Sequence, residues 1–447
     1  MNRQRHITAF VTDGDERPAL AITRSLGRRG VSVLVGAERP VSLASSSRYC
    51  DRHVTYPSPS RSPEAFDRFV QDLVERERLD LVVPVSDVTT HLVARRQDAL
   101  RHHAAIAAPP FHAFDVVSNK WSLLQRAAQC GIPIPRTHFI DGLAGLQARL
   151  ARIDYPAVIK PARSRMRTNV GWLAGSVQYA HCESDLLRLY RATGYLTSYP
   201  SLIQECIVGS GIGVFVLCDH GRLLTAFAHR RVREKPPSGG VSVLCESVAV
   251  DPELCRQAMR LLGPLGWHGV AMIEYKQDRR TGTPVLIEVN GRFWGSLQLA
   301  IDAGVDFPSL CSQLALSQRP DIPSIYKVGL RSRWLLGDLD HLLIRLLHGD
   351  RDVPDTAPSK LQTLINFLKF AAPGVRYDVC RRDDLRPAFY ELRQYVRTFS
   401  KSLAMNPAVR GVRLPRCSAR GRQPDLPEVR LQADTTYTRK TRHEHAF

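Results

Sequence analysis

The most informative stretch of this chain reads VLIEVNGRFWGS and occupies residues 285–296. Its first half predicts a β-strand, because apolar and β-branched residues dominate it. Side chains at positions i and i+2 of a strand point to the same face, so we expect Glu288 and Asn290 to lie side by side. A carboxylate on an otherwise apolar strand is costly to bury without a partner, so this pair requires a ligand or a counterion.

A second apolar strand with one carboxylate precedes this stretch. It runs over Val270–Tyr275 and carries Glu274, and a polar turn that contains glycine joins the two strands. Three hard oxygen donors on a rigid sheet suit Mg²⁺, which also binds the phosphate oxygens of nucleotides. The competing interpretation is a buried Glu–Arg ion pair, with Arg292 or Arg230 as the cation.

Two lysines at the ends of predicted elements add positive charge. Lys120 precedes a helical pattern, and Lys160 directly follows an apolar strand that begins near residue 155. A lysine in such a position can place its ammonium group on phosphate oxygens. The competing interpretation for either residue alone is an ordinary surface lysine.

The loop 229–242, which reads HRRVREKPPSGGVS, concentrates basic side chains around a Gly-Gly turn. Guanidinium groups and backbone N–H groups in such a loop can bind phosphate or carboxylate. We expect this loop to contact substrate and phosphate through Arg231, Arg233, Ser238, Gly239 and Gly240. The alternative is an exposed basic hairpin.

Together these motifs resemble the ATP-grasp superfamily, in particular its carboxylate–amine and carboxylate–thiol ligases. The resemblance covers roughly residues 1–320, counting the pre-ATP-grasp domain. The matching fragments are, in order, Asn119-Lys120, Ile159-Lys160-Pro161, Gln204-Glu205-x-Ile207-x-Gly209, Glu274 and Glu288-x-Asn290-x-Arg292. Each fragment is weak alone, but their order and spacing are fairly specific.

The resemblance implies a role for each matching residue. The α- and β-phosphates of ATP would be held by Lys120 and Lys160, and the adenine pocket would be lined by Gln204, Glu205 and the backbone of Ile207. One or two Mg²⁺ ions, with Mn²⁺ as the alternative, would be coordinated by Glu274, Glu288 and Asn290, and Arg292 would stabilise the transferring phosphoryl group and the bound carboxylate. The implied reaction activates a carboxylate as an acylphosphate and joins it to an amine or similar nucleophile, with release of ADP and phosphate.

The sequence departs from the family pattern at two points. The acidic residue that often follows the hinge glycine is missing from Gly209-Ser210-Gly211. The phosphate-covering loop after Lys160, usually rich in glycine, carries Arg163, Arg165 and Arg167 instead. These arginines would replace backbone contacts to phosphate or meet an anionic substrate.

The expected fold class is α/β and α+β, in four regions. Residues 1–115 alternate strand and helix patterns without a G-x-G-x-x-G fingerprint, which predicts a Rossmann-like pre-ATP-grasp domain. Residues 116–320 would form the two-subdomain ATP-grasp fold with a hinge near 204–209, and residues 321–400 a helical C-terminal extension. Residues 401–447 hold ten Lys or Arg against four Asp or Glu, which predicts a basic, disordered tail.

The composition narrows the function classes further. The 447 residues carry a net charge of +19, yet no aromatic and basic residues interleave as in nucleic-acid-binding proteins, so no specific nucleic acid is expected. The ten cysteines form no C-x-x-C pair, and no long apolar run predicts a signal peptide or membrane span. We therefore expect a cytoplasmic enzyme.

The expected partners are small-molecule carboxylates and amines. Contact of the basic C-terminal region with a membrane surface or a protein stays open, as does the oligomeric state. The alternative function is a catalytically silent ATP-binding scaffold within a biosynthetic or envelope assembly.

Overall fold

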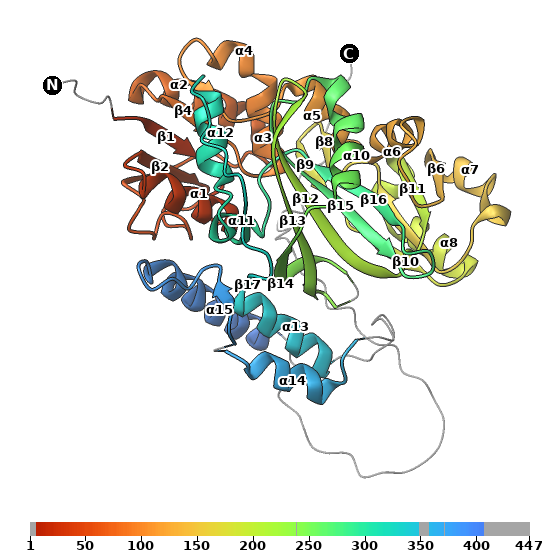
Figure 1. Cartoon of the computed structure of the whole chain (residues 1–447). Helices are drawn as coiled ribbons and strands as arrows, with labels where there is room; N and C mark the ends of the chain where they lie inside the picture. Colours follow the sequence, from red (N-terminus) through yellow and green to blue (C-terminus); the bar gives the residue numbers. More distant parts are fainter. Residues whose placement is uncertain (1–5, 238, 348–356, 371, 406–447) are drawn as a thin grey trace, which may run out of the picture. The chain divides into compact units, whose positions relative to one another are not determined.

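The computed structural model describes residues 6–237, 239–347, 357–370 and 372–405 (Figure 1). Its contacts divide the chain into two compact units, Met1–Val396 and Arg397–Phe447. Everything described below lies in the first unit, except the last turns of the final helix. Most of the predicted basic tail, from residue 406 onward, lies outside the described residues.

The N-terminal region is a parallel sheet with the strand order β3-β2-β1-β4-β5. Its elements are β1 (Thr8–Val11), α1 (Arg17–Gly27), β2 (Ser32–Ala37), β3 (Arg52–Thr55), α2 (Pro63–Glu77), β4 (Leu81–Val83), α3 (Asp87–Arg95), α4 (Gln97–Leu100), β5 (Ala105–Ile106) and α5 (Phe111–Ser118). Parallel strands need crossover connections, and helices supply most of them here. The expected Rossmann-like arrangement is confirmed.

A small antiparallel sheet with the order β10-β7-β11-β6 follows. The elements of this region are α6 (Lys120–Gln129), β6 (Thr137–Ile140), α7 (Gly142–Gln147), the short 3-10 helix η1 (Leu150–Arg152), β7 (Ala157–Pro161), the hairpin strands β8 (Arg165–Thr168) and β9 (Gly171–Ala174), β10 (Gln178–Ala180), α8 (Glu183–Ala192), α9 (Gly194–Ser198) and β11 (Ser201–Glu205). One face of the sheet is buried by Ile140, Ile159 and Ile203, which pack with side chains of α7, α8 and α9. The sheet therefore holds Lys160 and Gln204 on adjacent strands.

The largest sheet has the order β16-β15-β12-β13-β14-β17-β18. Its elements and their neighbours are β12 (Gly209–Asp219), β13 (Arg222–Lys235), β14 (Val241–Val248), α10 (Pro252–Leu262), the 3-10 helix η2 (Gly263–Leu265), β15 (Gly269–Asp278), β16 (Pro284–Asn290), α11 (Leu297–Ala303) and α12 (Phe307–Ala315). Long antiparallel strands dominate the middle of this sheet (Figure 1). Alternate residues of β12 and β15 point to two different cores, one of them shared with α10 and the other with α1, α11 and α12.

The C-terminal extension mixes helices with two short strands. Its elements are β17 (Arg331–Arg333), α13 (Leu335–Leu347), α14 (Lys360–Leu368), β18 (Val375–Tyr377) and α15 (Arg386–Met405). The predicted helices are present, but β17 and β18 also extend the large sheet, with β17 paired to β14. Strands of three residues are too short for their periodicity to be recognised in a sequence. The domain boundaries expected from the sequence stay predictions.

A buried arginine on α1 fixes the extension to the N-terminal region. The guanidinium group of Arg24 donates to the Asp384 carboxylate over 2.9 Å and to the carbonyl oxygens of Asp378, Val379 and Asp384. The side chains of Arg24 and Asp384 are fully buried. Because each of the three guanidinium nitrogens has a hydrogen-bond partner, the ion pair is tolerated in the core.

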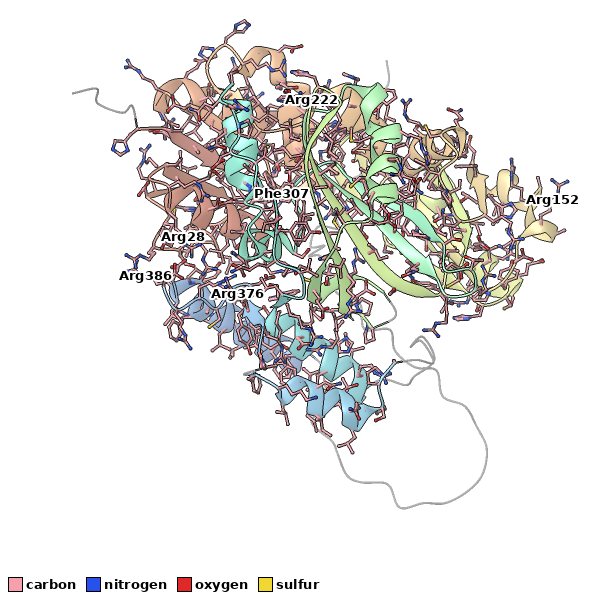
Figure 2. All side chains as sticks on the ribbon, in the orientation of Figure 1. Arg28, Arg152, Arg222, Phe307, Arg376 and Arg386 are labelled. Carbon is pink, nitrogen blue, oxygen red and sulfur yellow. The ribbon has the colours of Figure 1, made fainter. Side chains whose placement is uncertain are left out.

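We expect Arg24→Met to lower the free energy of unfolding by about 3–5 kcal/mol, because it leaves the Asp384 carboxylate buried without its cation. Urea titration measures the loss. The matched control is Arg28→Met, four positions further on and directly after α1 (Arg28 is labelled in Figure 2), where the side chains of Arg28 and Asp383 are 34% and 47% exposed. That change should cost at most about 1 kcal/mol. Equal losses in both variants would contradict the assignment of Arg24 as the anchor.

Candidate functional site

The three oxygen-bearing side chains expected on β15 and β16 converge. Glu274 lies directly across from Glu288 in the register of the two strands. The Asn290 amide nitrogen lies 3.1 Å from Oε1 of Glu274 and 3.3 Å from Oε1 of Glu288. The expectation that Glu288 and Asn290 share a face is therefore confirmed by the geometry.

Three cations surround these carboxylates. The ammonium group of Lys120 lies 3.3 Å from Oε2 of Glu288 and donates to the Ser164 hydroxyl over 2.7 Å. Lys160 reaches the same space from β7 and is 9% exposed. Arg231 on β13 donates to the Glu274 carboxylate. A Glu–Arg pair is thus present between Glu274 and Arg231. The cation is neither of the two expected arginines, Arg292 and Arg230. Arg230 pairs with Glu246 instead.

Burial and these charges act in opposite directions on the carboxylates. Burial works to raise the pKa of Glu288, but Lys120 and Lys160 outweigh it and hold the pKa at about 2. Burial raises the pKa of Glu274 above its usual range despite Arg231. Burial also lowers the pKa of Lys160 to about 8, against the attraction of Glu288. The Glu288 carboxylate is therefore ionised at neutral pH, whereas the Lys160 ammonium group loses its proton just above neutral pH.

These side chains lie at a cleft of about 690 Å³ between the two antiparallel sheets. Of the residues expected to bind nucleotide, Lys160, Gln204, Glu205 and Ile207 line this cleft, together with the apolar side chains Val158 and Ile287. Lys120 lines an adjoining smaller hollow that Glu288 and Asn290 share.

The strand end at residues 204–207 presents backbone and side-chain polar groups to one end of the cleft. The Gln204 side chain donates to the Thr137 hydroxyl over 2.9 Å, and Lys276 donates to the Ile207 carbonyl oxygen over 3.2 Å. Oε1 of Glu205 accepts from the backbone N–H of Arg136 over 2.9 Å. The apolar side chains of Val158 and Ile287 lie beside these polar groups at the end of β11. This combination could hold a planar base.

Arg292 connects the cleft to the N-terminal region. Its guanidinium group forms a two-pronged contact with Asp87 at the start of α3, with distances of 2.7 and 3.0 Å, and lies 3.2 Å from Oδ1 of Asn290. The attraction of Asp87 outweighs burial and raises the pKa of Arg292. This arginine is therefore charged, and it lines the cleft beside the oxygen cluster.

The basic loop divides between two environments. Arg231, Gly239 and Gly240 line the cleft. Arg233 instead binds the buried Asp338 carboxylate through two contacts of 2.6 Å and is absent from the residues that line the cleft. The structure thus places this predicted anion-binding residue elsewhere, and Ser238 lies outside the described residues.

Comparison with known proteins supports the same fold. Residues 197–335 match a family model described as ATP-grasp in the biosynthetic pathway with Ter operon. An L-amino acid ligase structure from Bacillus licheniformis superposes with a TM-score of 0.55 at 21% identity, covering 70% of this chain and 75% of that one. This chain has the ATP-grasp fold. The resemblance to the ATP-grasp superfamily expected from the sequence is confirmed.

Two further similar proteins differ from this chain in size or in the activity that their names state. The biotin carboxylase domain of 2-oxoglutarate carboxylase from Hydrogenobacter thermophilus, solved with MgADP and bicarbonate, has a TM-score of 0.58 at 13% identity and covers 73% of this chain and 74% of that one. The N-terminal section of the carbamoyl phosphate synthase large chain from Methanopyrus kandleri is 22% identical over 312 residues, which are 67% of this chain. The match spans only 53% of that relative.

The far end of the ATP-grasp cleft contains residues that the sequence did not single out. Arg17, at the start of α1, lines the cleft, although its guanidinium contacts Asp378 and stacks 4.1 Å from the centre of the Trp334 ring. Nε2 of His229 and Nε1 of Trp294 are buried and have no hydrogen-bond partner among the described residues. His229 and Trp294 belong to the stretches 229–242 and 285–296 quoted above, but no local pattern assigned either ring a role, and Arg17 follows a turn in another region.

The arginines after Lys160 do not line the cleft; Arg163 and Arg165 line the smaller hollow beside it, and Arg163 and Arg167 are paired with carboxylates. Arg163 contacts Asp115, and Arg167 contacts Glu64 while stacking 5.7 Å from the centre of the Trp172 ring. Both carboxylates belong to the segment before residue 119, so this ATP-grasp hairpin rests on the N-terminal region.

No helix in the described ranges is long and apolar enough to cross a membrane.

The low pKa of Glu288 makes its contribution to stability depend on pH. Its folded pKa of about 2 lies below the ordinary value of 4.5, so the stabilisation is present above pH 4.5 and is lost as the pH falls toward 2. We expect Glu288→Gln to lose about 3 kcal/mol of unfolding free energy at pH 7 and progressively less below pH 4.5.

Urea titrations of the Mg²⁺-free protein from pH 7 to pH 3 measure this difference. Glu183→Gln, an exposed glutamate at the start of α8, is the matched control and should follow the wild-type curve. A Glu288→Gln deficit that stays constant down to pH 3 would show that Lys120 and Lys160 do not set the charge state of Glu288.

Proposed function

We propose that this protein is an ATP- and Mg²⁺-dependent ligase that activates a carboxylate and joins it to an amine. One observation carries the proposal: Lys160, Glu274, Glu288 and Asn290 line a single cleft, with Lys120 in direct contact with Glu288. These side chains come from three separate segments of the chain. Together they supply the oxygen ligands that Mg²⁺ requires and the positive groups that a triphosphate requires.

The donor set fits a hard divalent cation. Glu274, Glu288 and Asn290 offer only oxygen ligands, and the side-chain oxygen and nitrogen of an asparagine exchange places by rotation of the amide. A bound Mg²⁺ would neutralise charge on the phosphate oxygens during phosphoryl transfer. The carboxylates then no longer need Lys120 and Lys160 as counterions, so both ammonium groups become available to phosphate.

The proposed reaction has two steps. An oxygen of the substrate carboxylate attacks the γ-phosphorus of ATP and ADP leaves, which produces an acylphosphate. The amine nitrogen then attacks the acyl carbon to form a C–N bond, phosphate leaves with the electrons of the broken C–O bond, and the proton lost by the nitrogen goes to the departing phosphate or to solvent. Positioning and charge neutralisation suffice for the first step, and Lys160, Lys120 and Arg292 are the cations we assign to it.

The end of the cleft near Arg292 is our assignment for the carboxylate and the amine. Arg292 and Arg17 supply positive charge there, and the unpartnered Nε2 of His229 and Nε1 of Trp294 supply hydrogen-bonding atoms. Burial lowers the pKa of His229 to about 3, so its imidazole is neutral and can accept a hydrogen bond from an amine. The nucleotide occupies the opposite end, beside Gln204, Glu205 and the backbone of Ile207.

The similar proteins named above include a carbamoyl phosphate synthase and an L-amino acid ligase, whose names imply different acceptors. We therefore assign the acceptor only as an amine or a similar nucleophile. A catalytically silent ATP-binding scaffold is the alternative, and release of ADP separates the two.

We expect the wild-type protein with ATP, Mg²⁺ and panels of carboxylates and amines to release ADP. Glu288→Gln should lower the rate at least about 100-fold, because it removes a carboxylate ligand of the Mg²⁺ ion that neutralises the phosphate oxygens. The control Glu183→Gln should retain the wild-type rate. Tight ATP binding without ADP release from any panel would favour the scaffold, and undiminished ADP release by Glu288→Gln would contradict the metal assignment.

The lowered pKa of Lys160 predicts a pH dependence for nucleotide binding. A triphosphate binds the ammonium form, which is lost above a pKa of about 8 in the free protein. The Kd for ATP should therefore rise about tenfold between pH 7 and pH 9. Isothermal titration with excess Mg²⁺ measures this rise.

Lys160→Arg is the informative variant, because a guanidinium group does not titrate in this range. Its Kd for ATP should change much less over the same pH interval. A wild-type Kd that stays flat from pH 7 to pH 9 would exclude Lys160 as a phosphate ligand.

A further inference from the structure

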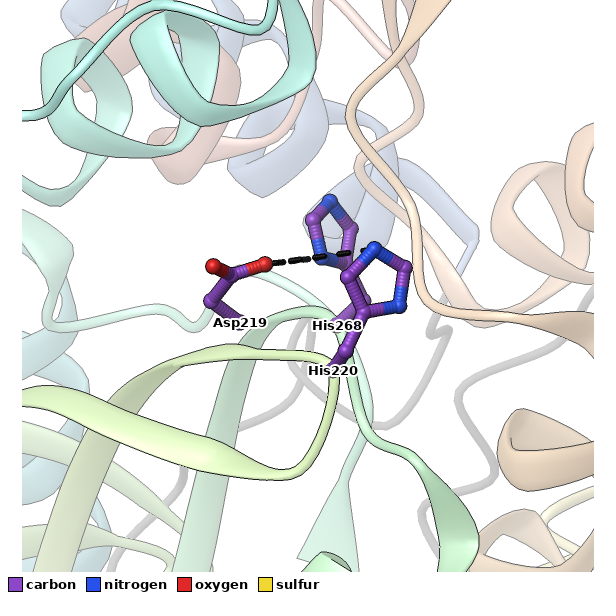
Figure 3. Close-up of side chains that lie close together, drawn as sticks. All are labelled: Asp219, His220 and His268. Carbon is purple, nitrogen blue, oxygen red and sulfur yellow. Dashed lines mark ion pairs between the residues drawn. The ribbon is translucent and has the colours of Figure 1, made fainter.

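Two histidines and an aspartate form a cluster outside the ATP-grasp cleft (Figure 3). Asp219 ends β12, His220 begins the turn that joins β12 to β13, and His268 directly precedes β15. None of the three lines the 690 Å³ cleft. They line a separate hollow of about 900 Å³, whose opposite side comes from residues that follow α12.

The backbone brings the three side chains together from two places in the chain. In the antiparallel register Cys218 lies across from Gly269, so the turn sits beside His268. The backbone N–H of Gly221 donates to the Trp267 carbonyl oxygen over 2.7 Å and fastens the turn there. A side chain at Gly221 would collide with the Gly263 carbonyl oxygen, at 2.6 Å from its Cβ, so glycine is needed for this close approach.

The spacing of the ligand atoms suits a small tetrahedral metal site. Oδ1 of Asp219 lies 3.3 Å from Nδ1 of His268 and 3.9 Å from Nε2 of His220. One ligand atom from each residue fits within a mutual distance of 4.8 Å. Bonds of about 2.0–2.1 Å to a tetrahedral zinc ion place neighbouring ligand atoms roughly 3.3 Å apart. Small side-chain rotations therefore bring all three atoms to bonding distance.

An ordinary ion pair accounts less well for the cluster. The distances of 3.3 Å from Asp219 to His268 and 3.9 Å from Asp219 to His220 are longer than the roughly 2.7–2.9 Å of a close charged hydrogen bond. Nδ1 of His268 is buried and forms no hydrogen bond with any described residue. The two imidazole rings lie 4.4 Å apart between their centres, and neutral imidazole is the form that binds metals.

We propose that Asp219, His220 and His268 bind a divalent transition-metal ion, with Zn²⁺ as the best fit. Two imidazole nitrogens and one carboxylate oxygen favour Zn²⁺ over Mg²⁺, which prefers oxygen ligands alone. The hollow leaves water access to the remaining coordination position. The ion would tie the β12–β13 turn to the start of β15, and this assignment is independent of the proposed ligase activity.

The test uses the full chain without a polyhistidine tag, after a chelator has removed bound metal. Excess Mg²⁺ is present throughout, so that it occupies the proposed site at Glu274, Glu288 and Asn290. Isothermal titration with Zn²⁺ should show one ion bound per chain. His220→Ala and His268→Ala should each weaken this binding at least about tenfold, because each removes a ligand.

His103→Ala is the matched control, because Nε2 of His103 also lies near a carboxylate, 3.6 Å from Glu75, but belongs to no three-ligand cluster among the described residues. It should leave Zn²⁺ binding unchanged. His220 is well exposed, so its variant should fold, and an unaltered melting temperature without metal checks this. Zn²⁺ should also raise the melting temperature of the wild type more than that of His220→Ala.

Co²⁺ gives a second readout, since a tetrahedral site with imidazole ligands produces visible absorption bands that His220→Ala and His268→Ala should abolish. Absence of a Zn²⁺ isotherm in excess Mg²⁺, or equal Zn²⁺ affinity in the wild type and both histidine variants, would overturn the proposal.

Discussion

The Glu288 carboxylate faces the ammonium groups of Lys120 and Lys160 in a largely buried space, and the rest of the cleft depends on this balance of charge. Lys120 begins a helix, Lys160 ends a strand of the small sheet and Glu288 lies on the large sheet. None of these charges could be buried alone at acceptable cost. The attraction between them therefore links the two sheets and the start of a helix at the cleft.

The same charges explain how the cleft could accept a nucleotide without rebuilding. In the structure each carboxylate has a protein cation, with Arg231 beside Glu274 and the two lysines beside Glu288. A metal ion and a triphosphate bring in both signs of charge together. Binding is then an exchange of partners within a preformed cluster, which avoids most of the cost of desolvating isolated ions.

The sequence predicted those parts of the site that depend on local spacing. Two apolar strands with carboxylates at fixed positions were sufficient to place Glu274, Glu288 and Asn290 together. The basic loop was harder, because Arg231 and Arg233 would share a face in a regular strand. A register shift between them turns Arg231 into the cleft and Arg233 toward Asp338, and side-chain patterning does not reveal such a bulge. Long-range pairs were equally hidden, since Arg292 and Asp87 are 205 positions apart.

The contacts of Arg17 have a consequence for how this protein could diversify. This side chain lines the cleft at the end that we propose for the acceptor, yet its orientation depends on Asp378 and Trp334 of the C-terminal extension. Gly295 gives it room, because a Cβ there would lie 3.0 Å from the guanidinium. Substitutions in the extension would thus move Arg17 at the cleft without touching Gln204, Glu205 or Ile207. Under the function that we propose, the extension is a place where acceptor preference can change separately from nucleotide binding.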